Sequence, residues 1–375
     1  MGFRASALNS VTLALRQRYG SEDALLTDSG TSALVLALRK MVPLGGTVAY
    51  PGYACIDLTT AALGAGVRVR LYDVDPATLS PDLDSVRAVM KRGVDAIVVA
   101  HLYGYPADMT GVTKLAQEQG IPVIEDAAQG AGGTLSGALL GGIGDVAILS
   151  FARGKGTTAG SGGAVLVRTT ALAEWTSGLR SALEPRSRGG VGVLSLAAQR
   201  VLSHPSLYNI PASIPALRLG EMVFRPPRSP HSMTAAGAAV LQCTLALEEN
   251  EIAARRVRAK ELLSRVKAAR NVAAVRAIPG GESGFLRLAL LAGAGGRIVR
   301  PDLGALPGYP MTLDQHVQLR PVLFSGERAG KGSERLRDNL FTVPTHSRTD
   351  QSDVARLSEW LNGEEAEARV VAQFS

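Results

Sequence analysis

The sequence predicts an α/β protein in which helices cover both faces of a mostly parallel sheet, so that the domain has three layers, followed by a smaller α+β domain. Between about residues 25 and 170, short apolar runs alternate with helical segments at the spacing of βαβ units. Of the 375 residues, 46% are hydrophobic and 19% are charged. A chain of this length and composition buries a large core and holds about two domains.

The expected strands of the large sheet are apolar runs of similar length. They lie at residues 47–51, 67–75, 95–101, 121–127, 145–151 and 162–168. Two of the intervening segments, LDSVRAVMKRG and MTGVTKLAQEQG, carry apolar residues at helical spacing and end in glycine, a frequent helix stop. These segments are therefore expected to be the crossover helices between parallel strands.

The alternation of strands and helices ends at residues 183–231. This stretch is rich in proline, and we interpret it as an insertion or lid. A long helix-forming tract over 232–270 follows and leads into the second domain. We therefore expect a large domain over 1–245 and a small one over 246–375. The small domain is expected to combine short strands such as FLRLALL with a terminal helix near residues 350–361.

Charge and cysteine content restrict the class of protein. The formal net charge is +7, from 40 basic and 33 acidic residues that are scattered along the chain. This modest positive balance favours anionic small molecules or acidic surfaces about as well as nucleic acid. Because no nucleic-acid recognition motif is present, a nucleic-acid partner is not expected. Cys55 and Cys243 lie far apart and have no metal-ligand spacing, so neither a disulfide framework nor a metal site is expected.

The expected location is the cytoplasm. The first 20 residues alternate charged and apolar residues, which predicts a surface helix rather than a signal peptide. Residues 191–219 are apolar with interspersed Arg and His. They suit a substrate lid, a subunit contact or a contact with a membrane surface, although packing over the sheet edge is the commoner use of such a segment.

Polar residues end three of the predicted strands: His101, the pair Glu125 and Asp126, and Ser150. Ligands of open parallel sheets bind in the crevice at the carboxyl ends of the strands. Three polar strand ends together therefore indicate a site there. Any one of them is also compatible with a loop residue that hydrogen-bonds to nearby backbone.

Gly30, Thr31 and Ser32 stand at the start of a predicted helix. Helix N-termini present unpaired N–H groups and a partial positive charge, so small residues at this place suit a phosphate group. Ordinary capping by Ser or Thr is the alternative, and it is the commoner explanation for such a motif alone.

Lys155 lies in a glycine-rich loop five residues after Ser150. A P-loop would need Gly in place of Leu149 and Ser or Thr in place of Gly156, so that motif is absent. A loop lysine by itself is usually solvated. Here Asp126 ends a strand 29 residues earlier, and pyridoxal 5′-phosphate (PLP) requires such a lysine for its Schiff base, an acid beside its ring nitrogen and a phosphate site.

Several segments, in order along the chain, resemble the DegT/StrS-type nucleotide-sugar aminotransferases, which are PLP enzymes of fold type I. The matching segments are SGTSAL (29–34), HLYGYPADM (101–109), VIEDAAQGAGG (123–133), GGIGDVAILSFARGKGTTAGSGGAV (141–165) and VPTHSRTDQSDVARL (343–357). The combination of VIEDAAQ with SF, Lys and GGAV at this distance is specific, whereas each segment alone is not.

The resemblance implies a role for each matching residue. Lys155 would bind the cofactor covalently, Asp126 would pair with the ring nitrogen, and Gln129 would lie near the phenolic oxygen. The phosphate would be held by small polar residues, namely Gly30, Thr31, Ser32 and Ser150.

Besides the insertion, the sequence departs from the family pattern in two places. Cys55 stands where the family has an aromatic residue that stacks on the cofactor, with Tyr53 two residues earlier. Cys55 is expected either to pack on the ring or to be a buried structural thiol. PHSM at 230–233 replaces an NYRM-like stretch that reaches the partner's phosphate site; His231, Ser232, Arg225 or Arg228 would substitute for it.

These observations predict a PLP-dependent aminotransferase. We expect it to move an amino group, from glutamate, to a keto group of a nucleotide-linked sugar and to work as a homodimer. His101, Tyr53 and His231 are the candidate substrate contacts. Two alternatives stay open, namely another PLP reaction such as dehydration on a lipid-linked or non-sugar substrate, and a non-catalytic regulatory or binding protein that keeps the fold.

Overall fold

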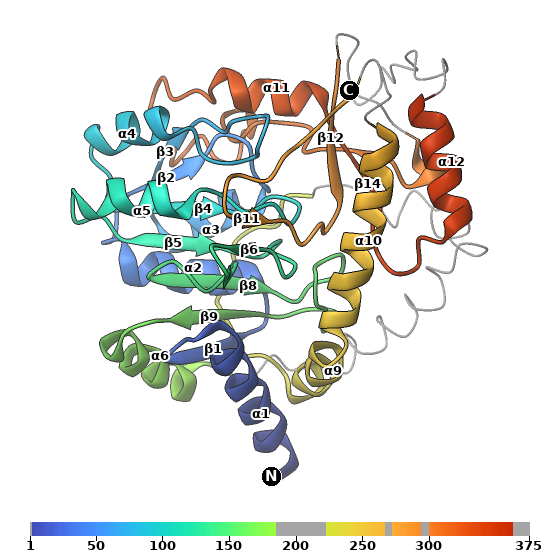
Figure 1. The fold of residues 1–375 in the computed structure, drawn as a ribbon. Helices are drawn as coiled ribbons and strands as arrows, with labels where there is room; N and C mark the ends of the chain where they lie inside the picture. The colour runs from blue at the N-terminus through green and yellow to red at the C-terminus, as the bar shows by residue number, and fades with distance from the viewer. Residues whose placement is uncertain (1, 185–222, 267–271, 294–299, 363–375) are drawn as a thin grey trace.

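A seven-stranded sheet lies between two layers of helices in the computed structural model (Figure 1), which describes residues 2–184, 223–266, 272–293 and 300–362. The strands, in spatial order, are β1 (Asp23–Thr27), β9 (Gly163–Val167), β8 (Val146–Ser150), β5 (Val123–Asp126), β4 (Ala96–Ala100), β2 (Thr47–Pro51) and β3 (Arg68–Tyr72). Only β9 runs against the others, so the predicted mostly parallel sheet is confirmed.

Helices from different parts of the chain cover the two faces of this sheet. One face is covered by α2 (Gly30–Met41), α3 (Asp57–Ala65) and α6 (Thr170–Ala182). The other is covered by α1 (Gly2–Tyr19), α4 (Leu83–Lys91), α5 (Met109–Gln117) and α9 (Ala235–Leu245). The two helices predicted between strands are α4 and α5, and each begins where an aspartate side chain accepts from a first-turn N–H.

A second, antiparallel sheet packs against helices of the C-terminal part. It consists of β10 (Val272–Ala274), β12 (Leu288–Ala292), β14 (Leu340–Val343) and β13 (Leu306–Pro307). The apolar side chains of this sheet pack on α10 (Glu248–Val266) and α12 (Gln351–Asn362). The remaining helices of the described part are the α-helix α11 (Lys331–Asn339) and the 3-10 turns η2 (Pro301–Leu303) and η3 (Leu313–Gln315).

A third, small sheet ties the two parts of the chain together. Its strand β11 (Gly281–Glu282) pairs with β6 (Thr134–Leu135), which in turn pairs with β7 (Ala138–Leu139). The helix-forming tract of 232–270 divides into α9 and α10 near residue 246. We propose this turn as the boundary between the large and small domains.

Parts of the predicted insertion lie outside the described residues. They include residues 191–219, on which the expected membrane or subunit contact falls. Within the described ranges, no helix is both long and apolar enough to cross a membrane.

The core position Leu38 on α2 provides a test of the layered packing. Its side chain is 0% exposed against the sheet, whereas Leu44 just after this helix is 91% exposed. We expect Leu38→Ala to lower the free energy of unfolding by about 2–5 kcal/mol, because it leaves a cavity, and Leu44→Ala to change it by less than about 0.5 kcal/mol. Urea denaturation of both variants measures the difference, and equal losses would contradict the packing described.

Candidate functional site

A pocket lies at the carboxyl ends of β4, β5 and β8, beside the start of α2. Most of the residues predicted for the site line it, namely Gly30, Thr31, Cys55, His101, Asp126, Gln129, Ser150 and Lys155. The structure therefore brings together side chains from five separate stretches of sequence. Ser32, Tyr53 and His231 are not among the residues that line the pocket.

Asp126 is the buried acid of the pocket. It ends β5, is 9% exposed, and its Oδ1 accepts a hydrogen bond of 3.0 Å from the backbone N–H of Ala128. Burial raises the pKa of Asp126 above its ordinary value, although this hydrogen bond and the positive charge of Lys155 oppose the rise. A cation bound beside Asp126 would favour its ionised form.

The start of α2 forms the floor of the pocket on the side of Ser150. Ser29 caps the helix, since its Oγ accepts from the N–H of Ser32 at 3.0 Å. The hydroxyl of Ser32 donates to Asp28 Oδ1 at 2.6 Å, so Ser32 supports the cap and does not face the pocket. Both interpretations of this motif, a helix cap and a phosphate site, therefore remain compatible with the structure. Ser29 caps the helix, while Gly30 and Thr31 line the pocket.

Glycine at position 30 allows the helix to approach Ser150. A Cβ on Gly30 would lie 2.8 Å from Cβ of Ser150, which is too close for unbonded carbon atoms. The hydroxyl of Ser150 and the first N–H groups of α2 consequently share one corner of the pocket, as an anion site requires.

Lys155 reaches the pocket from the loop between β8 and β9. Gly154 before it adopts a φ of 77°, and a Cβ on Gly156 after it would lie 2.8 Å from Cα of Ala131. The two glycines allow a tight turn and a close approach of the backbone. The positive charge of Lys155 lowers the pKa of both Asp126 and Cys55, in keeping with a position in the same pocket.

Cys55 is a neutral thiol at the pocket wall. Burial, followed by the nearby carboxylate of Asp57, raises the pKa of Cys55 to about 12. Its Sγ donates to Asp57 Oδ2 at 3.7 Å. A thiol that stays protonated is a poor nucleophile, so Cys55 offers the pocket a small polarizable surface.

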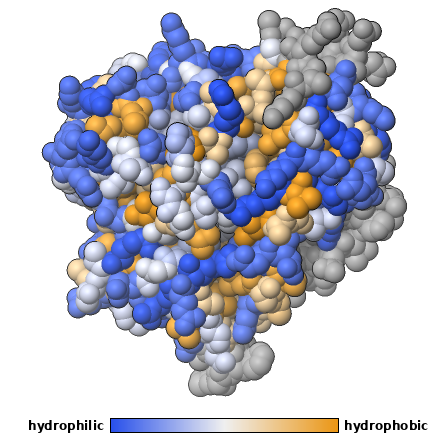
Figure 2. Space-filling model, viewed as in Figure 1, coloured by the Kyte–Doolittle hydropathy of each residue, from blue (hydrophilic) through white to orange (hydrophobic). Residues whose placement is uncertain are grey.

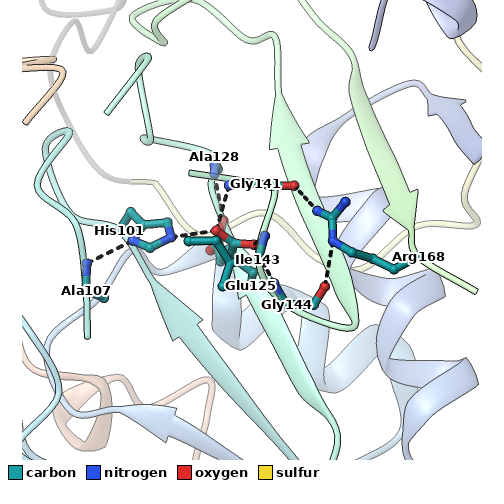
Figure 3. Close-up of polar contacts among 9 residues, drawn as sticks. His101, Ala107, Glu125, Ala128, Gly141, Ile143, Gly144 and Arg168 are labelled. Carbon is teal, nitrogen blue, oxygen red and sulfur yellow. Dashed lines mark hydrogen bonds and ion pairs between the residues drawn. The ribbon is translucent and has the colours of Figure 1, made fainter. Parts of the chain in front are cut away.

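Glu125, next to Asp126, lies at the centre of a buried hydrogen-bond network (Figure 3). Its carboxylate accepts from the backbone N–H groups of Gly141, Ile143 and Gly144 at 2.6, 2.8 and 2.8 Å. His101 Nε2 lies 2.9 Å from the same carboxylate. Burial raises the pKa of Glu125, but the interactions with His101 and with the backbone donors outweigh it, and the pKa is lowered overall.

Both ring nitrogens of His101 are used inside the protein. Nδ1 accepts a hydrogen bond of 3.0 Å from the N–H of Ala107, so Nε2 carries the proton that is donated to Glu125. The ring therefore has no polar atom left for a substrate, the role proposed for it from sequence. Arg168, which directly follows β9, supports the loop of residues 141–144, since it donates to the carbonyls of Gly141 and Gly144 (Figure 3).

The other two candidate substrate contacts lie away from the pocket wall. Tyr53 is fully buried, and its oxygen accepts from the backbone N–H of Tyr309 at 2.7 Å. His231 pairs through its backbone with Asp28, and its Nδ1 lies 3.0 Å from the carbonyl of Ser229.

Several pocket residues were missed by sequence reasoning as members of the site, among them Ser29, Asp57 and Tyr309. Tyr309 hydrogen-bonds to Gln129, whose Nε2 donates to the phenol oxygen at 2.5 Å. No sequence signal predicted that Tyr309 belongs to the site, because it follows Gln129 by 180 residues and lies in a short turn segment. Arg225, suggested as a substitute phosphate contact, does line the pocket.

Comparison with known proteins confirms the family resemblance. Residues 8–188 match the sequence model of the DegT/DnrJ/EryC1/StrS aminotransferase family. The L-glutamine:2-deoxy-scyllo-inosose aminotransferase of Streptomyces fradiae is 36% identical over 154 residues, which cover 41% of this chain and 36% of that protein. The UDP-N-acetyl-3-dehydro-alpha-D-glucosamine 3-aminotransferase of Acidithiobacillus ferrooxidans is 37% identical over 155 residues, or 41% and 42% of the two chains.

The matched region thus spans only about two fifths of the length of these curated relatives. The solved structures extend the likeness in fold to nearly the whole chain. A DegT DnrJ EryC1 StrS aminotransferase from Brucella abortus has a TM-score of 0.71 at 21% identity and covers 95% of this chain and 90% of its own. The predicted fold class is therefore confirmed.

The Glu125 network generates a prediction about acid stability. Because the folded pKa is lowered, the stabilising contribution of Glu125 is complete above its unfolded value near 4.5 and is lost as the pH falls toward the folded pKa. We expect Glu125→Gln to lower the free energy of unfolding at pH 7 by about 3 kcal/mol and to flatten its dependence on pH below about pH 5.

Glu118→Gln is the matched control, since Glu118 is exposed at the end of α5. Chemical denaturation at several pH values measures both variants. A pH dependence unchanged in Glu125→Gln, or changed equally in Glu118→Gln, would show that Glu125 does not carry this stability.

Proposed function

We propose that this chain is a PLP-dependent aminotransferase that transfers an amino group from glutamate to a keto group of a nucleotide-linked sugar. Its residues 8–188 match the sequence model of the DegT/DnrJ/EryC1/StrS aminotransferase family. The observation that carries the proposal is the meeting of Lys155 and Asp126 in one pocket with the N-terminus of α2. A lysine amine, a buried acid and an anion site are the three groups that PLP needs.

The donor set of the pocket fits the cofactor. Lys155 would bind its carbonyl carbon, and Asp126 would hold the ring nitrogen, where the positive charge of the protonated ring would keep this carboxyl ionised. Thr31, Ser150 and the first N–H groups of α2 would hold the phosphate. Glycine at position 30 keeps this corner free, since any Cβ there would meet Ser150.

The residues in and around the pocket would have different roles in the reaction. Bound PLP supplies the electron sink that stabilises negative charge on the substrate carbon. The amine of Lys155 would accept a proton on Nζ and return it during the transfer. Cys55 would cover part of the ring as a neutral group and keep water from it, and the Glu125 network would hold the neighbouring strand ends in place.

The acceptor is proposed to be an anionic, nucleotide-linked keto sugar. The net charge of +7 and the exposed Arg225 at the pocket favour a phosphate-bearing substrate. One relative is named for a UDP-linked 3-dehydro sugar. The homodimer and the cytoplasmic location belong to the same proposal. The homodimer rests on the family resemblance, and the location rests on the cysteine content and the character of the first 20 residues.

Another relative favours a different amino donor and a different keto acceptor. Its name specifies L-glutamine as the donor and 2-deoxy-scyllo-inosose, a ketone without a nucleotide, as the acceptor. Glutamine with a cyclic polyol ketone is therefore the alternative pair for this chain.

Replacement of Lys155 tests the cofactor chemistry. With added PLP we expect the wild-type protein to show the absorbance band of PLP bound to a lysine, and Lys155→Ala to lose it, because no other lysine of the described residues lines the pocket. Lys114→Ala on the exposed side of α5 should keep the band. Borohydride reduction followed by peptide mass analysis locates the modified lysine, and a label outside Lys155 would refute the assignment.

Donor and acceptor panels test the substrates. Glutamate should remove the absorbance band of the wild-type protein, and a UDP-linked 3-keto sugar should then restore it, because the two half-reactions run in opposite directions. Glutamine and a keto-inositol are the comparison pair. If only this second pair acts, the acceptor is a polyol ketone; if no donor changes the band, the protein is not an aminotransferase.

A further inference from the structure

Tyr309 is held rigidly in the wall of the pocket by two other tyrosines. Its ring centroid lies 5.2 Å from that of Tyr53 and 5.6 Å from that of Tyr103. Its backbone N–H donates to the oxygen of Tyr53 at 2.7 Å. Gly308 makes this contact possible, since a Cβ there would lie 2.1 Å from the Tyr53 oxygen. The position of the Tyr309 ring is therefore fixed from its backbone and from both neighbours.

The hydroxyl of Tyr309 is constrained by Gln129. The Gln129 Oε1 accepts from the N–H of Tyr103 at 2.9 Å, so the Nε2 group is the one that faces Tyr309. Nε2 donates to the Tyr309 oxygen at 2.5 Å. A phenol can accept and donate at once, and here the oxygen is the acceptor. Within the described ranges, the Tyr309 hydroxyl donates its own hydrogen to no protein group.

Burial decides the protonation state of this phenol. Burial, followed by the neighbouring Tyr103 and Cys55, raises the pKa of Tyr309 well above its ordinary value. The group is thus a neutral hydrogen-bond donor at physiological pH and is not a base. With an exposed fraction of 8%, Tyr309 lines the same pocket as Lys155 and Asp126.

We propose that the Tyr309 hydroxyl donates a hydrogen bond to an electron-rich oxygen of the molecule in the pocket and is a catalytic residue of the proposed reaction. The inference rests on the proposed function. Two oxygens have the required chemistry, the phenolic oxygen of the cofactor ring and the keto oxygen of the acceptor. Tyr309 lies outside residues 8–188, so the family match does not assign it.

The test compares Tyr309→Phe with Tyr105→Phe. Tyr105 is also buried, and its oxygen accepts from the backbone N–H of Ala289 at 3.3 Å, outside the pocket wall. Each change removes one buried hydroxyl and keeps the ring. Both variants are loaded with PLP and followed by absorbance over a pH series and by the rates of the two half-reactions.

The two sources of the oxygen give different results in Tyr309→Phe. If the cofactor oxygen is the acceptor, the midpoint of the pH titration of the bound-PLP band shifts by about one pH unit. If the keto oxygen is the acceptor, the titration is unchanged and kcat/KM for the keto acceptor falls about tenfold or more, while the half-reaction with the amino donor keeps its rate. Tyr105→Phe should show neither change.

A Tyr309→Phe protein with wild-type titration and wild-type rates overturns the inference, as does an equal change in Tyr105→Phe. If Tyr309→Phe fails to fold because Gln129 loses its partner, the double variant Tyr309→Phe with Gln129→Met removes both polar groups and takes its place, with Gln129→Met alone as its reference. A wild-type protein without a Lys155-dependent band refutes the proposed function itself, and this inference with it. A band that is present, with Tyr309→Phe indistinguishable from wild type, refutes only the role of Tyr309.

Discussion

The buried carboxylate of Glu125 is the interaction on which the pocket depends. It is fully buried beside Asp126, and it would be costly in that place without the donors that surround it. Through His101 it fixes the end of β4, and through three backbone N–H groups it fixes the loop before β8. The carboxyl ends of β4 and β5, which form part of the pocket, and the loop that enters β8 are thereby held relative to one another.

Two adjacent residues of β5, Glu125 and Asp126, have different roles, one structural and one in the pocket. Successive side chains of a strand point to opposite faces of the sheet, so Glu125 and Asp126 face different surroundings although they are adjacent in sequence. Glu125 is surrounded by donors and its pKa is lowered, whereas Asp126 lines the pocket and its pKa is raised. Two neighbouring acids thus have opposite electrostatic environments, one used to hold loops and the other available to a bound cation.

The C-terminal part of the chain completes the wall of the pocket. Tyr309 is held by Tyr53 and Tyr103, which belong to the large sheet region, and it contacts Gln129 from across 180 residues of sequence. The strand pair of β11 and β6 ties the same two regions together. The site is therefore a product of both parts of the chain, although the lysine and the acid come from the first.

Sequence reasoning located most of the strands because they are continuous apolar runs, but it missed β1. That strand begins with Asp23, a buried acid that Thr176 and Arg180 of α6 stabilise. The residues next to Asp23 in the sequence do not reveal that Thr176 and Arg180 will stabilise it. The reversed direction of β9 was also not stated, although the loop that carries Lys155 has no crossover helix, and antiparallel strands need none.

The sequence by itself determined the class of sheet, the family resemblance and the lysine, acid and small-residue motifs, because apolar periodicity and short spacings are local properties. The tertiary structure decided which polar groups remain available to a ligand. It assigned Ser32 to the helix cap, both nitrogens of His101 to internal hydrogen bonds, and Tyr309 to the pocket wall. The physical reason is that a hydrogen-bonding group is available only where folding leaves it without a protein partner, and those partners come from distant parts of the chain.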